Sequence, residues 1–322
     1  MPPLPKSRAD IDLRDLCPDN LLHQEEDILI FSTKNNLELL SEADIIFMDG
    51  TFSVAPRLFK QLYTLHVLFK DFYLPVCYAL LPSKSGDIYY RFFEIVKFKM
   101  SRIDLILNPQ TILVDFEAAM LTSVRQHFPA TNVKGCFFHF TQAIWRNTQS
   151  IGLVSIYNDN STVRRIVRSL MALAMLPKNW VRHQYRQILE MPDADHPLVQ
   201  NLFRYFESTW LDGRFPIAMW NVFDSSVKTN NCVEGWHSTF RICVGKCHPN
   251  IYELVTAINT EQNMTEKKVR AAREGEKPPP QKKIYRKRAE EMTLLKNRFN
   301  SGGLSLKEYF DAIRKHIGYR RI

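Results

Sequence analysis

Two short apolar runs, each ending in an aspartate, constrain the fold of this chain more than any other feature. Asp49 follows the run Ile45–Met48. Asp115 follows the run Thr111–Val114. Runs of this length and composition are typical of buried strands. A carboxylate at the end of such a strand is costly to bury unless something neutralises its charge. The pattern therefore predicts two buried strands that deliver acids to one place.

The segments around these runs alternate between strand and helix patterns. Tyr63–Phe69 and Tyr73–Leu81 are rich in β-formers and predict an antiparallel meander, with Pro75 at an edge or a bulge. Further elements are expected as helices at 86–102, 117–127 and 138–147 and as a strand at 132–137. This alternation predicts a mixed α/β sheet with helices packed on it.

A long helical segment interrupts the α/β pattern. Residues 150–227 show only helical periodicity, and two more helices are expected after them, at 233–244 and 251–268. The expected domains are a poorly ordered lead-in at 1–27, the first part of the α/β core at 28–148, a helical insertion at 149–228, the last part of the core at 229–272, and a basic linker with a C-terminal helix at 273–322.

Charge and cysteine content narrow the classes of function. The 322 residues carry a net charge of +9, and between Met264 and Arg298 there are 12 basic but only 5 acidic residues. This excess favours a polyanionic partner. Six cysteines are too few for a disulfide scaffold in a chain of this length. The sequence has neither a secretory signal pattern nor a long apolar stretch free of charges, so we expect neither an exported nor a membrane-spanning protein.

A third acid, Glu234, completes a candidate metal site. It lies at the expected start of a helix, after a run of polar turn formers. Carboxylate oxygens are the ligands that Mg²⁺ and Mn²⁺ prefer. Two such ions bridged by Asp49, Asp115 and Glu234 would activate a water or a 3′-hydroxyl group and stabilise the leaving oxygen of a phosphodiester. Taken singly, each acid also fits a plain turn or a helix terminus.

Four motifs together resemble a known family. They are Asp49-Gly50-Thr51-Phe52, Val114-Asp115-Phe116-Glu117-Ala118-Ala119, Gly135-Cys136-Phe137-Phe138-His139-Phe140-Thr141-Gln142-Ala143 and Asn230-Asn231-Cys232-Val233-Glu234-Gly235-Trp236-His237. Their order and spacing are similar to those of the transposase domain of Mutator-like elements (MULE), over about residues 28–260. The resemblance implies an RNase H-like fold with a DDE triad, interrupted by a helical insertion before the last acid. It assigns Asp49, Asp115 and Glu234 to the three catalytic and metal-binding positions, with two Mg²⁺ or Mn²⁺ ions.

The pair Cys136 and His139 has two interpretations. Tetrahedral zinc needs four ligands, and no second pair at a compatible spacing follows, so zinc is not expected. The resemblance implies that this pair either positions DNA or organises the active site. A buried thiol and a hydrogen-bonded histidine at a strand-to-helix junction would also account for it.

Two groups of basic residues are candidates for binding DNA. Arg164, Arg165 and Arg168 fall on one side of an expected helix. The second group is a basic run that also fits a nuclear-import signal or a solvated tail. Its candidate residues are Lys282, Lys283, Arg286, Lys287 and Arg288.

The sequence leaves two functions open. The first is a transposase that cuts and transfers DNA strands with divalent metal, located in the nucleus, with DNA as partner and self-association as an option. The second is a domesticated or decayed transposase that binds DNA or protein without cleavage. The second is motivated by the lack of an upstream zinc-binding module of the kind that similar transposases often use to recognise DNA. Only two potential zinc ligands, Cys17 and His23, occur before Asp49. The retained acids favour the first.

Overall fold

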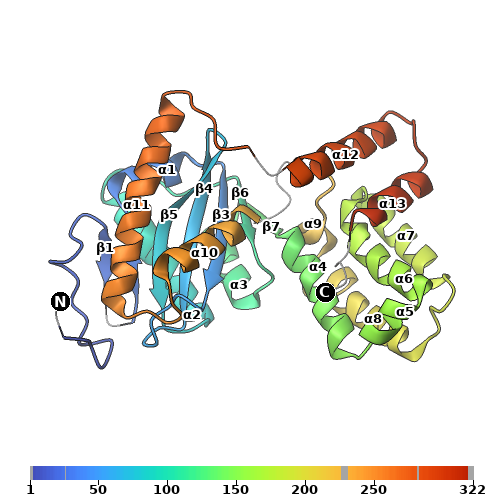
Figure 1. Cartoon of the computed structure of the whole chain (residues 1–322), viewed down its shortest axis with the longest axis horizontal. Coiled ribbons are helices and arrows are strands. Elements are labelled where there is room, and N and C mark those ends of the chain that lie inside the picture. The colour runs from blue at the N-terminus through green and yellow to red at the C-terminus, as the bar shows by residue number, and fades with distance from the viewer. Residues whose placement is uncertain (1–2, 26, 226–230, 281–282, 318–322) are drawn as a thin grey trace. The chain divides into compact units, whose positions relative to one another are not determined.

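The computed structural model describes residues 3–25, 27–225, 231–280 and 283–317. The chain divides into two compact units. The first comprises residues 1–134 and 230–278, and the second comprises residues 135–229 and 279–322. The first unit is built on a β-sheet, whereas the described part of the second is built from helices (Figure 1).

The first unit contains a mixed seven-stranded sheet of order β1-β2-β5-β4-β3-β6-β7. Its strands are β1 (Leu21–Gln24), β2 (Leu29–Phe31), β3 (Ile45–Thr51), β4 (Gln61–Phe69), β5 (Phe72–Leu81), β6 (Thr111–Val114) and β7 (Asn132–Gly135), of which the last ends at the boundary of the unit. Its helices are α1 (Lys34–Glu42), α2 (Gly86–Ser101), α3 (Ala118–His127), α10 (Asn231–Val244) and α11 (Ile251–Arg273). The expected α/β class is confirmed, and the architecture is consistent with an RNase H-like fold.

The structure contains the expected antiparallel pairing of β4 and β5, and the backbone of its turn suits the residues found there. Lys70 and Asp71 both have positive φ, 45° and 70°, as a two-residue hairpin of type I′ requires. Pro75 lies in the interior strand β5, opposite His66, where the register with β4 shifts. Because a bulge leaves a ladder position unpaired, it accommodates a residue without an N–H group. Pro75 therefore occupies a bulge, one of the two places expected for it.

Opposite faces of the sheet carry different helices. Tyr63 in β4 contacts Tyr89 and Phe92 of α2, with ring centroids 5.6 and 6.1 Å apart. Tyr78 in β5 contacts Trp236 of α10, with centroids 5.8 Å apart. Side chains alternate between the two faces of a sheet along each strand, and these two tyrosines point to opposite faces. The helices α2 and α10 therefore cover opposite faces of the sheet. Figure 1 shows α10 and α11 across one face of the sheet. Both faces of the central strands are thus covered, which explains their nearly uninterrupted apolar sequence.

The N-terminal segment differs from the expected lead-in. Ile11, Leu13 and Cys17 are buried in the core shared with β2, β5 and α11. β1 pairs antiparallel with β2 and extends the sheet. The expectation of a poorly ordered segment over residues 1–27 was wrong for these residues. Their scattered apolar positions have no strand or helix period, so only tertiary packing reveals their burial.

The second unit contains the helices of the expected insertion and the C-terminal helices. They are α4 (Phe137–Ser150), α5 (Val154–Asp159), α6 (Ser161–Ala172), a 3₁₀ turn (Leu173–Met175), α7 (Lys178–Leu189), α8 (Pro197–Phe206), a π-helical turn (Glu207–Leu211), α9 (Ile217–Trp220), α12 (Lys283–Asn300) and α13 (Leu306–Lys315).

Aromatic rings form the core of this unit. Phe140 of α4 stacks on Trp220 with centroids 4.9 Å apart and contacts Trp210 edge-on at the same distance. Tyr309 of α13 donates a hydrogen bond to the backbone oxygen of Met175, at 3.0 Å. The C-terminal helices therefore pack with the insertion instead of forming a separate linker.

Candidate functional site

Asp49 and Asp115 occupy matching positions on neighbouring parallel strands. Phe47 in β3 lies opposite Leu113 in β6. Two residues after Phe47 comes Asp49, which is still in β3. Two residues after Leu113 comes Asp115, which lies just after the end of β6. Because side chains in register on adjacent strands project to the same face, the sheet alone directs both carboxylates to one place. This is the arrangement that the two apolar runs predicted.

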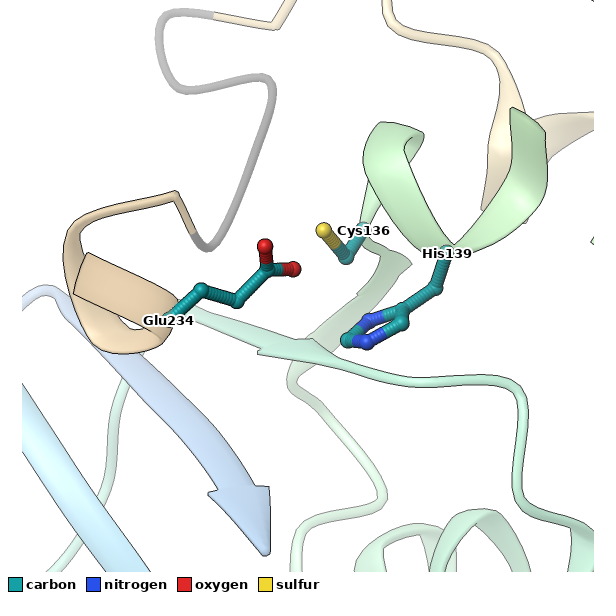
Figure 2. A group of neighbouring side chains, drawn as sticks. All are labelled: Cys136, His139 and Glu234. Carbon is teal, nitrogen blue, oxygen red and sulfur yellow. The ribbon is translucent and has the colours of Figure 1, made fainter. Parts of the chain in front are cut away.

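Glu234 joins these aspartates from a helix. It lies in the first turn of α10, which packs against β3, and Figure 2 shows its side chain leaving that turn. The charges of Asp115 and Glu234 both raise the pKa of Asp49. Within the first unit, the structure therefore places Asp49 within electrostatic reach of both other predicted acids, which come from segments far apart in sequence.

Burial, aided at the two aspartates by neighbouring negative charges, holds these acids toward their neutral forms. Asp49 is only 7% exposed, and desolvation, followed by the charge of Asp115, raises its pKa to about 8. Desolvation and the charge of Glu117 raise the pKa of Asp115 to about 6. Desolvation raises the pKa of Glu234 to about 7. At neutral pH the cluster therefore gains stability from any added positive charge.

The donor set fits divalent cations. Carboxylates that are buried or partly buried and lie close together are suited to hard ions such as Mg²⁺ and Mn²⁺, which prefer oxygen ligands. Asp49, Asp115 and Glu234 would hold such ions, and the ions would favour the charged form of each acid. The raised pKa values are thus the observation that makes this cluster a candidate metal site.

His237 connects the helix that carries Glu234 to the strand that carries Asp49. Its Nδ1 lies 3.6 Å from Oδ2 of Asp49, and its Nε2 lies 3.3 Å from Oγ1 of Thr64. The Thr64 hydroxyl donates to the backbone oxygen of Asp49, at 3.2 Å, and lies 3.0 Å from Nε2 of the buried His66. This polar network inside the core fixes the end of β3 against α10.

Trp236 fixes α10 from the other side. Its indole N–H donates to Oε1 of Glu261 in α11, at 2.9 Å. Its ring stacks on Phe240, one turn later in α10, with centroids 4.7 Å apart. The direction of α10, and with it the position of Glu234, is therefore set by contacts on two sides of the helix.

Gly50 permits a close approach next to Asp49. A Cβ atom at this position would lie 2.6 Å from Oε1 of Gln61 and 3.1 Å from the Tyr63 ring. Gln61 is itself held by donating to the Tyr89 hydroxyl, at 2.8 Å. The glycine that follows Asp49 is thus required by packing on the face of the sheet that α2 covers.

Lys84 and Glu117 lie beside the cluster. The Lys84 ammonium is 2.5 Å from Oε2 of Glu117, and the Tyr89 hydroxyl donates to Oε1 of Glu117, at 2.7 Å. The charge of Lys84 lowers the pKa of both Asp49 and Asp115, against the larger effect of burial. Lys84 could not be recognised from the sequence, because an isolated lysine in a loop carries no local signal.

The second unit places Cys136 and His139 together at the start of α4, as Figure 2 also shows. The Cys136 thiol is buried and lies within 4.8 Å of a ring nitrogen of His139. Burial, with a contribution from Arg146, lowers the pKa of His139 to about 4. The imidazole is therefore neutral at pH 7, and the role of this pair in organising the active site stays a prediction.

The arginines predicted to bind DNA have different surroundings. Arg164 donates to the backbone oxygens of Tyr157 and Asn158, and Arg168 donates to the Tyr157 hydroxyl at 3.3 Å. Arg165 is exposed. Arg164 and Arg168 thus help to hold α5 on α6, which leaves Arg165 as the most accessible of the three. Their contact with DNA stays a prediction.

Most of the basic run lies on the exposed first turns of α12. Lys283, Arg286, Lys287 and Arg288 are exposed, whereas Lys282 lies outside the described residues. Arg286 and Lys287 pair with acids one turn further along the helix, with N–O distances of 3.6 and 3.9 Å. Pairs this exposed are weak, so these side chains remain accessible to a polyanion.

The fold and the acids together define an α/β domain that carries a cluster of three carboxylates. Residues 45–143 match the protein family described as the MULE transposase domain. The matched segment is thus similar to the transposase domain of that family. It includes Asp49, Asp115, Cys136 and His139, and it ends before Glu234. No curated protein matches the chain. Within the described residues, no helix has both the length and the apolar character needed to cross a membrane.

Proposed function

We propose that this protein is a DDE-type transposase that cleaves DNA strands and transfers them with the help of two Mg²⁺ or Mn²⁺ ions. The observation that carries the proposal is the cluster of Asp49, Asp115 and Glu234, which three distant segments contribute to one face of the sheet. Folding alone does not explain it, because like charges brought together destabilise the protein in the absence of metal.

Each side chain has a definite task in this mechanism. Asp49, on the central strand β3, and Asp115, at the end of β6, would supply ligand oxygens from a rigid sheet, and Glu234 would complete the set from α10. When bound, the metal ions would activate the attacking hydroxyl group and stabilise the leaving oxygen. Cleavage forms a bond from phosphorus to the water oxygen and breaks the bond to O3′, which leaves as a hydroxyl. In strand transfer that 3′-hydroxyl attacks a second phosphodiester, whose own O3′ leaves in turn.

Nicking of supercoiled plasmid by the purified chain tests this proposal. The wild type should nick DNA in Mg²⁺ or Mn²⁺ but not in EDTA. Asp49→Asn and Glu234→Gln should each reduce nicking by at least about 100-fold while the protein stays folded, because the amide keeps the size of the carboxylate but loses its charge. Asp104→Asn, a change of an exposed loop residue, is the matched control. Nicking retained in both site variants would refute the mechanism.

A binding function without cleavage is the second candidate. The exposed basic start of α12 favours it, since that surface could hold DNA whether or not the acids are active. Under this alternative the wild type shows no metal-dependent nicking, and its salt-dependent DNA binding weakens when Lys283, Arg286, Lys287 and Arg288 are neutralised. The same run supports our proposal of a nuclear location, which a fluorescent fusion with and without these four substitutions would test.

A further inference from the structure

Lys84 connects the two loops that follow the first two aspartates. It belongs to the segment between β5 and α2. Its ammonium lies 4.6 Å from the centre of the Phe52 ring, and Phe52 is three residues after Asp49. The same ammonium pairs with Glu117, two residues after Asp115. One cation thus contacts both of the loops that follow the strand-end acids.

Neighbouring groups hold Lys84 in place without burying it. The Glu117 carboxylate that pairs with it also accepts from the Tyr89 hydroxyl, which in turn accepts from Nε2 of Gln61. The Lys84 side chain is nevertheless 36% exposed, and residue Phe52, whose ring it contacts, is 43% exposed. A lysine ammonium has three donors, and a single close carboxylate partner leaves capacity for another acceptor.

The contribution of this ion pair to stability does not account for the arrangement. Ion pairs with exposed members add little to folding, because solvent screens them and ordering the long side chain costs entropy. An exposed cation next to an acidic cluster has a clear use if the ligand is a polyanion. The carboxylates repel an incoming phosphodiester, and a fixed positive charge at their edge gives one of its oxygens a favourable contact.

We propose that Lys84 binds a backbone phosphate of the DNA strand that enters the carboxylate cluster, and that Phe52 and Glu117 position it for this contact. The inference rests on the proposed function, because it takes DNA as the ligand. It adds a substrate-binding residue to the three acids. Contacts of this kind place a strand and carry no sequence information, so Lys84 should act alike on all sequences.

DNA binding measured apart from cleavage tests the inference. Fluorescence anisotropy of a labelled duplex is recorded at several salt concentrations, with Ca²⁺ in place of Mg²⁺. Lys84→Met keeps a side chain that can cover Phe52 but removes the charge, and it should lower the slope of log affinity against log salt by about 1. Lys84→Arg should retain the wild-type slope. Lys246→Met, which breaks an exposed pair with Glu253 at 2.7 Å, is the matched control.

Plasmid nicking in Mn²⁺ gives an independent readout. Lys84→Met should raise the DNA concentration needed for half-maximal nicking on the order of tenfold, as expected for losing one charged hydrogen bond, with a smaller change in the rate at saturation. A salt slope in Lys84→Met that falls no further than in Lys246→Met would overturn the inference, even where Asp115→Asn abolishes nicking. If the wild type does not nick DNA at all, the proposed function fails, and the binding comparison still decides the role of Lys84.

Discussion

Replacing Asp49 by asparagine should stabilise the metal-free protein, and increasingly so as the pH rises. Asp49 is almost fully buried, and desolvation together with the charge of Asp115 raises its pKa from 3.8 to about 8. The folded protein therefore holds this proton more tightly than the unfolded chain does. The stability that the neutral Asp49 provides is fully present below pH 4 and is lost as the pH rises through 8. An asparagine has no such loss.

The size of the effect follows from this shift. Each pKa unit corresponds to about 1.4 kcal/mol, so a rise of about four units sets a ceiling of about 6 kcal/mol on the unfolding free energy that is lost at pH 8 and above. Part of the shift comes from Asp115, which can itself take up a proton and relieve the repulsion. We therefore expect Asp49→Asn to be about 2–4 kcal/mol more stable than the wild type at pH 8 and nearly equal to it at pH 4.5.

Thermal and urea unfolding in EDTA, followed from pH 4.5 to 8.5, measures this difference. For a unit of this size, 1 kcal/mol corresponds to about 2–4 °C in the midpoint temperature. Asp104→Asn reports the effect of removing an exposed carboxylate in the same unit and should follow the wild type at every pH. Parallel curves for Asp49→Asn and the wild type across this range would show that Asp49 is not held neutral by its surroundings, and the electrostatic account of the cluster would be wrong.

The remaining predictions concern metal, packing and the helix that carries Glu234. Mn²⁺ should raise the midpoint temperature more at pH 8 than at pH 5.5, because protons compete for the same oxygens, and Asp115→Asn should remove most of this rise in a thermal-shift assay. Gly50→Ala should cost about 1–3 kcal/mol in urea unfolding, since its Cβ would meet Gln61; a neutral result would mean that Gln61 can move aside. Trp236→Phe should cost about 1–2 kcal/mol by leaving Glu261 without its indole donor, and Trp236→Ala should cost more because the stack on Phe240 is also lost; a Trp236→Phe variant as stable as the wild type would argue against the hydrogen bond, and equal costs of the two variants would argue against the stack.

The sequence was sufficient to predict the parts of the site that depend on local patterns. An apolar run that ends in an acid indicates a buried strand wherever its partner lies, and β3 and β6 met that expectation. The parallel pairing of these strands then places Asp49 beside Asp115. A single sequence does not specify which strands pair, but the α/β pattern favours parallel pairing. Glu234 could be proposed because a polar turn before a helix is also a local signal.

The contacts that support the acids could not be predicted in the same way. His237 meets Thr64, and Lys84 meets Glu117, across segments with no shared period. Such pairs depend on register and on how helices cross the sheet, and a lone lysine in a loop is usually solvated. The burial of Leu13 was missed for the same reason, because its partners come from strands and a helix that lie far along the chain.

The charge balance of the cluster supports the proposed enzyme over the alternative of a passive binding module. Asp49 and Glu234 both have pKa values raised to near or above neutrality, so their ionisation weakens the fold at pH 7. The positive charge of Lys84 only partly offsets the effect of burial on the two aspartates, and Lys84 is also paired with Glu117. A protein that merely holds DNA would gain stability and lose repulsion of phosphates by replacing any of these acids with its amide. The acids are useful where a cation must be held next to a phosphodiester, which is the requirement of metal-assisted strand cleavage.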